Sequence, residues 1–513
     1  MSFRPIFGIP RLTQDWGTEQ HERETHWTSL FYDLMVVAAL NAIAEPFEEA
    51  EEPEGEELRF LQEVQGSTDG TDGTSDTVHE QELFLLTPIK HLWLCALLQF
   101  VSVVNPWNFL NEFTSMFEDE SFIGHISFFV HAFGLAATTA GCVGELEENY
   151  KVLANGIILA KIGLLVLYAR PLIYVKRART HILVRAVSHC VNIALMLWAI
   201  TCPYETFRTL LIISSFWDWA GLFFLLALNK EQRIPIHIQS YADRIKEVTM
   251  VIFGEAIFAI ILQPYSEAKK QTHFYIALAS TLWMIYAMAL QEFHILPNDD
   301  DHALRRSVVF GYLWYFTNFF KQFCLLGTSI GIKRAHLLMF KAPLQPIDQD
   351  TRRLIVWGLS MNMLSVQMIR SYSFGFGRHP NKDDPPKLYR LKVLWWTIMI
   401  VAVLAPQLVD FIILEHVSAQ PLVVLISFGC LMSLVIMGEA AMSNLVAEHL
   451  RRLMQELDTC GGGGEPGEMT YLHSSSAVRQ YSSSEDVPQE QSHPHKCAFP
   501  MEHCPTKAKP EES

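Results

Sequence analysis

Residues 421–446 run PLVVLISFGCLMSLVIMGEAAMSNLV, an apolar segment with a single acidic side chain, Glu439. An α-helix rises about 1.5 Å per residue, so about 20 apolar residues cross the roughly 30 Å hydrocarbon core of a bilayer. Similar blocks recur along the chain, where apolar residues make up 50 % of the 513 residues and short charged breaks separate the blocks. The pattern predicts an all-α fold, a polytopic transmembrane helical bundle.

About 12 blocks are expected to form spanning helices. The seventh is polar enough to need an argument, because it contains a glutamate near its centre. Its residues 248–262 hold ten large apolar side chains, worth about −0.3 to −0.6 kcal/mol each, which offset one glutamate at about +3 kcal/mol. The expected spans are 27–47, 84–105, 122–143, 152–175, 180–202, 207–228, 241–263, 273–296, 306–331, 353–373, 390–414 and 421–446.

Composition and missing motifs exclude several classes of function. A net charge of −16 disfavours nucleic acid as a partner, and nine cysteines are too few for a disulfide scaffold. The sequence contains no phosphate-binding loop, no Rossmann glycine pattern, no Gly-x-Ser-x-Gly elbow and no His-Glu-x-x-His helix. We therefore expect no enzyme activity and no cofactor. The tail residues His493, His495, Cys497, His503 and Cys504 lack tetrahedral zinc spacing, so we expect no metal site.

The spans define a membrane domain over residues 27–450. Residues 1–26 contain no apolar run, so we expect no signal peptide there and expect the first span to act as its own insertion signal. An acidic loop at 48–82 and a tail at 451–513, rich in Gly, Ser and Pro, are predicted to be disordered.

Lysines and arginines between the spans predict a cytosolic location for both termini. Basic residues gather before the first span, around 176–179, at 305–306 and at 451–452, whereas the 47–83 loop has almost none. Residues 332–353 weaken this bias, because they carry five basic residues and would lie on the opposite side.

Asp33 lies about two turns into the first span. A carboxylate at that depth is costly, so we expect it to face the bundle interior with a partner. Tyr32 and Asn41 are polar companions on the same helix. The alternative is an acid at the membrane surface that caps the helix or pairs with a basic residue at its end.

Arg244 and Glu255 lie on one face of the seventh span, 11 residues apart, with Arg244 near the membrane surface and Glu255 near the middle. Gly254 is expected to let a neighbouring helix approach closely beside the carboxylate. We expect Arg244 to hold Glu255 or an anionic substrate. The alternative is a buried ion pair that only fixes the register of the helices.

Two segments resemble a known family. Phe31-Tyr32-Asp33-Leu-Met-Val-Val is similar to the Phe-Phe-Asp-Leu-Val-Phe-Val motif of the bacterial low temperature requirement A membrane proteins. Asp243-Arg244 followed by Gly254-Glu255 resembles that family's Glu-Arg and Leu-Gly-Glu motif. Tyr32 and Asp243 depart from the motifs, and the acidic loop is an addition. The resemblance, over about residues 25–450, implies a multi-pass helical fold and supplies no reaction.

The segment around Glu255 has a counterpart near the C-terminus. Val251-Ile-Phe-Gly-Glu-Ala256 recurs as Val435-Ile-Met-Gly-Glu-Ala440, identical at five of six positions. The copies lie in the seventh and twelfth spans, which would run in opposite directions, as in transporters built from inverted repeats. Chance similarity between apolar helices is the alternative, with Glu439 as a capping or packing residue.

Further ionisable side chains fall within the spans. Asp218 lies mid-span between two tryptophans and needs a partner, for which Lys161 and Lys321 are candidates. Each charge alone is explained by structural pairing, but the set favours a polar, hydrated cavity. Its members are Lys161, Arg185, His189, Asp218, Glu292, Lys321, Arg370 and Asp410.

Together these features predict an integral membrane protein that acts as a channel or secondary transporter for a small ion or solute. Asp33 and Glu255 would be the titrating acids, with Arg244, Asp218 and Glu439 at the same ion- or substrate-binding site. The expected partners are the lipid bilayer and the transported species, and whether copies form a homo-oligomer stays open. The alternatives are a non-transporting scaffold or stress-response protein, and a membrane enzyme acting on a lipid.

Overall fold

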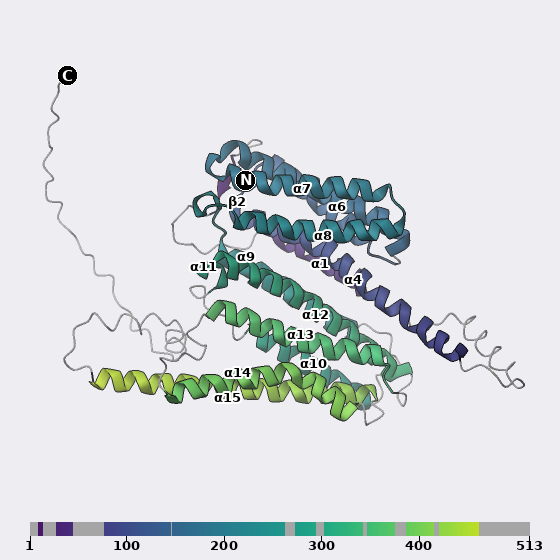
Figure 1. The fold of residues 1–513 in the computed structure, drawn as a ribbon, viewed down its shortest axis with the longest axis vertical. Coiled ribbons are helices and arrows are strands. Elements are labelled where there is room, and N and C mark those ends of the chain that lie inside the picture. The colour runs from purple at the N-terminus through teal and green to yellow at the C-terminus, as the bar shows by residue number, and fades with distance from the viewer. Residues whose placement is uncertain are drawn as a thin grey trace, which may run out of the picture. The chain divides into compact units, whose positions relative to one another are not determined.

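Helices account for nearly all of the structure, a computed structural model that describes residues 9–13, 27–44, 76–144, 146–261, 272–293, 302–341, 346–374, 386–414 and 420–460 (Figure 1). The α-helices of these residues are α1 (Trp27–Ala44), α4 (Asp76–Met116), α5 (Phe122–Ala140), α6 (Leu146–Tyr174), α7 (Arg179–Ile200), α8 (Tyr204–Leu226), α9 (Ile238–Ile261), α10 (Thr272–Phe293), α11 (Ala303–Arg306), α12 (Val308–Lys341), α13 (Gln349–Phe374), α14 (Pro386–Val409) and α15 (Pro421–Cys460). Strands β1 (Arg11–Leu12) and β2 (Phe117–Glu118) pair antiparallel.

Each of the twelve predicted spans corresponds to one long helix, so the all-α fold is confirmed. Three helices extend ten or more residues beyond a predicted end, and one of them is α12, which ends at Lys341 instead of residue 331. Helix α4 begins at Asp76 and ends at Met116, so the last part of the predicted 48–82 loop and the residues after 105 are helical. Helix α15 continues to Cys460, beyond the predicted end of the membrane domain at 450. Residues 45–75 and 461–513, with the rest of that loop and tail, lie outside the described residues.

Length and surface chemistry identify the helices as membrane-spanning. Eight of the described helical segments are long and apolar enough to cross a bilayer. Their outer faces expose large apolar side chains, among them Phe129 and Phe133 of α5, Phe223 of α8, and Ile400 and Leu404 of α14. Such surfaces suit lipid and are unfavourable in water. The protein is therefore an integral multi-pass membrane protein.

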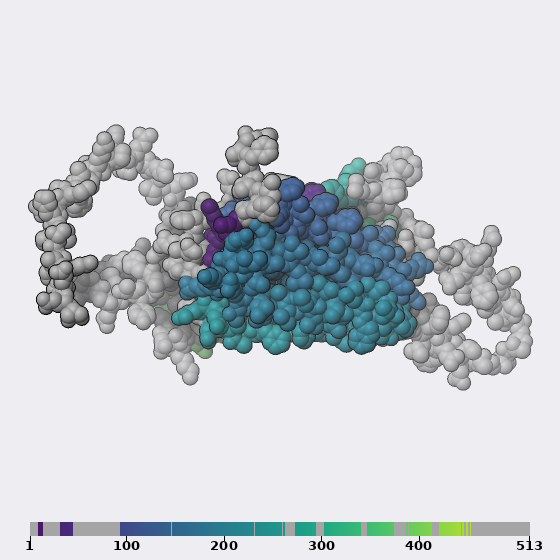
Figure 2. Space-filling view, turned by 90° about the horizontal axis from the view of Figure 1, so that it is seen from above, coloured from purple at the N-terminus to yellow at the C-terminus, as the bar shows by residue number. Residues whose placement is uncertain are grey.

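Helix α4 lies at the centre of the contacts. It packs against α1, α5, α6, α8 and α9, and it reaches α12 through Phe100, whose ring lies 5.2 Å from that of Phe319. Trp107, in its C-terminal third, is 1 % exposed. Figure 2 shows the helices coloured blue to teal as one continuous packed surface beside β1, in purple. Polar side chains carried on α4 are therefore held inside protein.

Glycines bring α5 and α6 into close contact. A Cβ added to Gly156 of α6 would lie 2.2 Å from the backbone nitrogen of Thr138 on α5, and one on Gly134 would lie 2.2 Å from that of Ala160. Gly254 does not have this role, contrary to the expectation from sequence. A Cβ there would meet no described atom within 4 Å, because this face of α9 is turned away from its neighbours.

The sequence in which residues of one helix contact residues of another shows whether two helices in the second half of the chain run parallel or antiparallel. Trp283 and Gln291 of α10 contact Ser433 and Glu439 of α15, in that order, so α10 and α15 run parallel. Thr281 and Glu292 of α10 contact His336 and Lys321 of α12, in reversed order, so α10 and α12 run antiparallel.

Helix α9 follows α12 in direction, because Tyr241 lies against Trp314 and the carbonyl of Ile245 accepts from Gln322. It therefore runs opposite to α15. The two Gly-Glu segments thus have the opposite orientations that an inverted repeat requires. In both, the glycine meets no described atom within 4 Å, whereas the glutamate is buried. Duplication itself stays a prediction.

Candidate functional site

Asp33 and Arg244 form a buried ion pair between α1 and α9. Asp33 Oδ2 accepts from Arg244 Nη1 at 2.7 Å, and Asp33 Oδ1 accepts from the indole nitrogen of Trp107 at 2.9 Å. Arg244 also donates to Glu247 at 3.1 Å. Both Asp33 and Arg244 are less than a tenth exposed. Asp33 therefore faces the bundle interior with a cationic partner, whereas its depth in the membrane stays a prediction.

Glu255 of α9 also contacts α1, further along both helices than the Asp33–Arg244 pair. Oriented as a donor, the Asn41 amide nitrogen is 3.0 Å from both Glu255 oxygens. Arg244 is paired with Asp33 rather than with Glu255, because 11 residues separate the two along α9, about 16 Å. Tyr32 does not serve Asp33 either; its hydroxyl donates to the His131 carbonyl at 3.5 Å. The order of these contacts shows that α1 and α9 run parallel.

Asp218 of α8 pairs with Lys161 of α6, one of the two partners expected. The Lys161 ammonium donates to both carboxylate oxygens, at 2.7 and 2.9 Å. The same ammonium lies 4.1 Å from the centre of the Phe109 ring on α4. Ion pairing and a cation–π contact together satisfy a lysine that is fully buried.

Glu439 of α15 belongs to a separate cluster. Its carboxylate accepts from Arg370 of α13 and, at 3.4 Å, from the amide of Gln291 on α10. Nearby, Lys321 of α12 donates to Glu292 of α10. The structure therefore brings Asp33 and Arg244 together, but it gives Asp218 and Glu439 partners of their own.

Glu112 is a buried acid that the sequence analysis missed. Both of its oxygens accept from Arg185 of α7. The predicted second span ended at residue 105, so Glu112 was assigned to a connecting loop. The sequence did contain a signal: Asn105, Asn108, Glu112 and Ser115 recur every three or four residues, which places them on one helical face.

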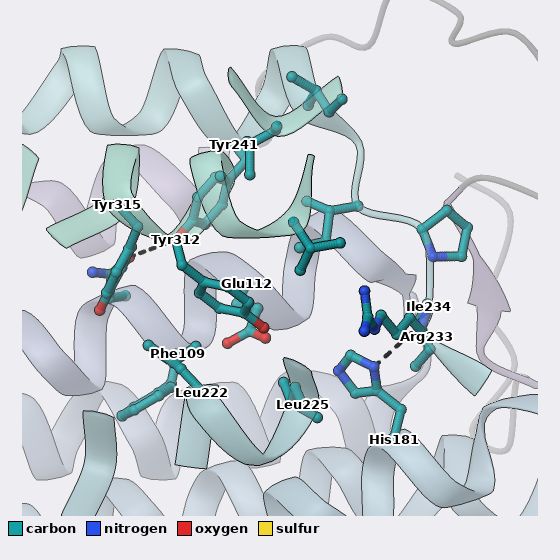
Figure 3. A pocket seen from close by; sticks show the side chains of 17 residues that line it. Phe109, Glu112, His181, Leu222, Leu225, Arg233, Ile234, Tyr241, Tyr312 and Tyr315 are labelled. Atoms are coloured by element: carbon teal, nitrogen blue, oxygen red, sulfur yellow. Dashed lines mark hydrogen bonds between the residues drawn. The ribbon is translucent and has the colours of Figure 1, made fainter. Parts of the chain in front are cut away.

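A cavity of about 390 Å³ opens beside Glu112 (Figure 3). Helices α4, α7, α8, α9, α11 and α12 and the connection before α9 line it. Its polar side chains are Asn108, Glu112, His181, Arg233, Tyr241, Tyr312 and Tyr315, and the remaining lining is mostly apolar.

This cavity adjoins the Asp33–Arg244 pair without including it. Asn108, in the wall, follows Trp107, which donates to Asp33. Tyr241, also in the wall, donates to Asn108 at 3.1 Å and precedes Arg244 by about one turn of α9. None of the five residues predicted as the site lines the cavity. The polar interior therefore begins at Glu112 and continues to the charge pair at Asp33.

Metal coordination finds no support in the described part of the chain, where no group of three or more His, Cys, Asp or Glu residues could hold an ion. The histidines and cysteines of the tail lie outside it.

A family model described as bacterial low temperature requirement A protein matches residues 78–439, more than half of the chain. The match is shorter than the resemblance suggested: it contains Arg244 and Glu255 and ends at Glu439, whereas the motif around Asp33 precedes it. Comparisons with curated proteins and with solved structures found no match. Because the matched region covers most of the membrane domain, the chain belongs to the bacterial low temperature requirement A family.

Proposed function

We propose that the protein is a channel or secondary transporter for a small ion or solute and that it catalyses no covalent reaction. The observation that supports this most directly is the Asp33–Arg244 pair, which lies about one helical turn from a cavity with polar walls. A charge pair next to a cavity can exchange its partner for a ligand or a proton, whereas a pair sealed in apolar packing cannot.

The number of buried charges supports the proposal further. Uncompensated charges inside a membrane cost several kcal/mol each, and apolar residues pack a bundle at no such cost. Five buried ion pairs nevertheless connect different helices: Asp33–Arg244, Glu112–Arg185, Lys161–Asp218, Glu292–Lys321 and Arg370–Glu439.

In this proposal Asp33 and Glu255 carry the ion or proton, and Arg244 positions Asp33. Glu439 is the counterpart of Glu255 in the second repeat. Helices α1 and α9 run parallel and hold the two acids at different depths. Arg244 contacts Asp33, and Asn41 contacts Glu255.

A second candidate function is a non-transporting scaffold. It is favoured by the completeness of the pairing, because each of the acids Asp33, Asp218, Glu255 and Glu439 has a polar partner among the described residues. In that case the charges only specify which helices pack together.

The two functions separate in liposomes that contain the purified full-length protein. Proton, potassium and chloride flux are measured for the wild type, Asp33→Asn and Glu255→Gln. We expect flux of at least one ion in the wild type and its reduction by about tenfold or more in both variants, because each loses a charge buried in the bundle. Glu205→Gln is the matched control, since Glu205 lies in the first turn of α8 with a side chain that is 73 % exposed.

Thermal stability in detergent completes the comparison. Unchanged flux of every ion in Glu255→Gln would remove the transport role of that residue. Lower melting temperatures for Asp33→Asn and Glu255→Gln, with no flux in any form of the protein, would favour the scaffold.

A further inference from the structure

The twelve long helices of the described residues fall into two groups of six that make matching contacts. The first unit is α1 and α4–α8, and the second unit is α9, α10 and α12–α15. In each unit the first helix packs on the second and the third: α1 on α4 and α5, and α9 on α10 and α12. The third packs on the fourth, the fourth on the fifth, the fifth on the sixth, and the sixth returns to the second. The chain therefore follows the same path twice.

Buried charges occupy matching helices of the two units. In the first unit, Lys161 of the fourth helix, α6, pairs with Asp218 of the sixth helix, α8. In the second unit, Arg370 of the fourth helix, α13, pairs with Glu439 of the sixth helix, α15. Both cations also reach the second helix of their unit, Lys161 at an aromatic ring of α4 and Arg370 at a backbone carbonyl of α10. Cation and acid thus have the same places in both units.

The third and fourth helices of each unit approach each other at a glycine and a threonine. A Cβ added to Gly358 of α13 would lie 2.2 Å from the hydroxyl oxygen of Thr328 on α12. In the first unit, Gly156 of α6 meets Thr138 of α5 in the same manner. A small residue therefore permits close packing of the same two helices in each unit.

The first helices of the two units, α1 and α9, contact each other and have matching polar positions. Asp33 precedes Asn41 by eight residues on α1, and Glu247 precedes Glu255 by eight residues on α9. When these positions are aligned, Asp33 corresponds to Glu247, and Asn41 corresponds to Glu255, which it contacts. The identical residues of this alignment are Val37 and Val251, Ala42 and Ala256, and Ile43 and Ile257.

The direction of α1 and α9 gives the relation between the units. Because these two helices run parallel, the units have the same orientation in the bilayer. Transporters built from repeats place the binding site at the junction of the repeats. The two Gly-Glu segments both lie in the second unit, so this relation differs from theirs. It matches Glu439 with Asp218, an alternative to the correspondence between Glu439 and Glu255.

Arg244 joins the matching acids at the junction of the units. The same nitrogen, Nη1, donates to Asp33 at 2.7 Å and to Glu247 at 3.1 Å. Asp33 also accepts from Trp107, so it keeps a neutral donor when the arginine leaves it. Arg244 likewise keeps a carboxylate beside it, that of Glu247, when Asp33 accepts another cation.

We propose that the chain is a tandem of two six-helix units in one orientation and that Glu247 is the counterpart of Asp33 at their junction. Glu247 is a positioning residue. It neutralises Arg244 while Asp33 exchanges the arginine for a proton or a small cation. This role deepens the proposed function and rests on it, whereas the sharing of Arg244 between the two acids does not.

Thermal unfolding of the full-length protein in detergent tests the shared arginine. The forms compared are the wild type, Asp33→Asn, Glu247→Gln and the double variant. Because either acid alone still neutralises Arg244, we expect the double variant to lose about twice the sum of the two single losses in melting temperature. A double variant that does not fold, when both single variants do, is the extreme case of this result.

Asp243→Asn is the matched control, because Asp243 lies on the same turn of α9 and pairs with Lys246 at 2.8 Å. Its loss in melting temperature should add to that of Asp33→Asn without coupling. Additive losses for Asp33→Asn and Glu247→Gln would overturn the shared contact.

Flux in liposomes tests the positioning role, with proton and potassium flux measured separately. We expect Glu247→Gln to lower the flux of the cation that the wild type carries by about tenfold, at a melting temperature near that of the wild type. Glu247→Asp should restore this flux, and Asp243→Asn should leave it unchanged.

Wild-type flux in Glu247→Gln would overturn the positioning role. Loss of flux together with a lower melting temperature, without rescue by Glu247→Asp, would overturn it as well, because the role would then be structural. Absence of flux in the wild type would instead remove the proposed function, and the positioning role with it. The melting temperatures would still decide whether the two acids share Arg244.

Discussion

Lys161 and Asp218 illustrate how a single charge is held inside the bundle. The ammonium of Lys161 reaches both oxygens of Asp218 and also lies against the face of Phe109, so three helices share one pair of charges. Removing either partner would leave the other uncompensated in a medium of low polarity, which is more damaging than replacing both. The five buried ion pairs between helices share this arrangement, in which each charge lies beside an opposite charge on a neighbouring helix.

His302 provides a test of charge burial outside the spanning segments. It precedes α11, and its Nδ1 accepts from the backbone N–H of Leu304 at 3.3 Å. Burial, together with Lys246 and Arg305, lowers its pKa from 6.5 to about 4, against an opposing effect of Asp243. The folded protein therefore keeps this ring neutral at a pH where the unfolded chain takes up a proton.

Acidification from pH 6.5 toward pH 4 should therefore destabilise the protein, by up to about 3 kcal/mol from His302 alone. His302→Asn keeps a side chain able to cap α11 but cannot titrate. We expect its melting temperature in detergent to fall less over this pH range than that of the wild type. His273→Asn, at an exposed position of α10, is the control. Parallel pH profiles for the wild type and His302→Asn would contradict the prediction.

The sequence identified which charges are buried better than it identified their partners. The depth of Asp33 and Asp218 follows from their place in an apolar run, because burial is a property of the helix that carries them. Pairing is a property of two helices, and the partner of Asp33 lies 211 residues away. The position of Asp218 in mid-span left two intramembrane lysines, Lys161 and Lys321, as candidate partners. It could not reveal the cavity, whose walls come from six helices and a connection.

Helix α6 owes its position to small residues. Gly156 lies so close to α5 that a methyl group would overlap the Thr138 backbone nitrogen at 2.2 Å. Backbone atoms cannot move aside as a flexible side chain can, so the two helices would have to separate.

Gly156→Val should therefore lower the melting temperature markedly, with an overpacking cost of about 1–3 kcal/mol or more. Gly254→Val is the matched control on α9, where a Cβ added to the glycine meets no described atom of another helix within 4 Å. Fluorescence-detected size-exclusion chromatography after heating measures both. Equal loss of folded protein in the two variants would show that close approach of α5 and α6 is not the cause.

Positions of whole elements were predictable because hydrophobicity alone determines which segments enter the bilayer. The ends of the helices were less predictable than their positions. Helices α4 and α15 continue into polar sequence, where hydropathy carries no signal. The role assigned to Gly254 was wrong for a related reason. A glycine in a helix indicates an available close approach, but only the neighbouring helices decide whether that face is used.

At the scale of the whole molecule, twelve long helices lie within the described residues of the membrane domain. Some of the basic residues at 332–353, which weakened the predicted orientation, form ion pairs in the structure. Arg334 lies within α12, buried and 3.6 Å from Asp348, and Arg352 pairs with Asp410 at 2.8 Å. They still count as basic residues near the ends of spans, so the orientation of the N-terminus stays a prediction.

If every long helix crosses the bilayer, the even number places both termini on the same side. We propose the cytosolic side and expect epitope tags at either end to be cleaved only when protease reaches the cytosol. Digestion in sealed, right-side-out and inverted vesicles measures this, with a lumenal protein as the control for leakage. A C-terminal tag protected from cytosolic protease would contradict the arrangement.

The Asp33–Arg244 pair has a consequence for how the molecule is made. The ribosome delivers the acid 211 residues before its arginine, so α1 leaves the translocon with an unneutralised carboxylate or is retained beside it until α9 arrives. Glu112 of α4 is likewise synthesised before Arg185 of α7, the residue that neutralises it. A truncated chain that stops before α9 would leave Asp33 without its arginine inside the membrane, where an uncompensated charge costs several kcal/mol.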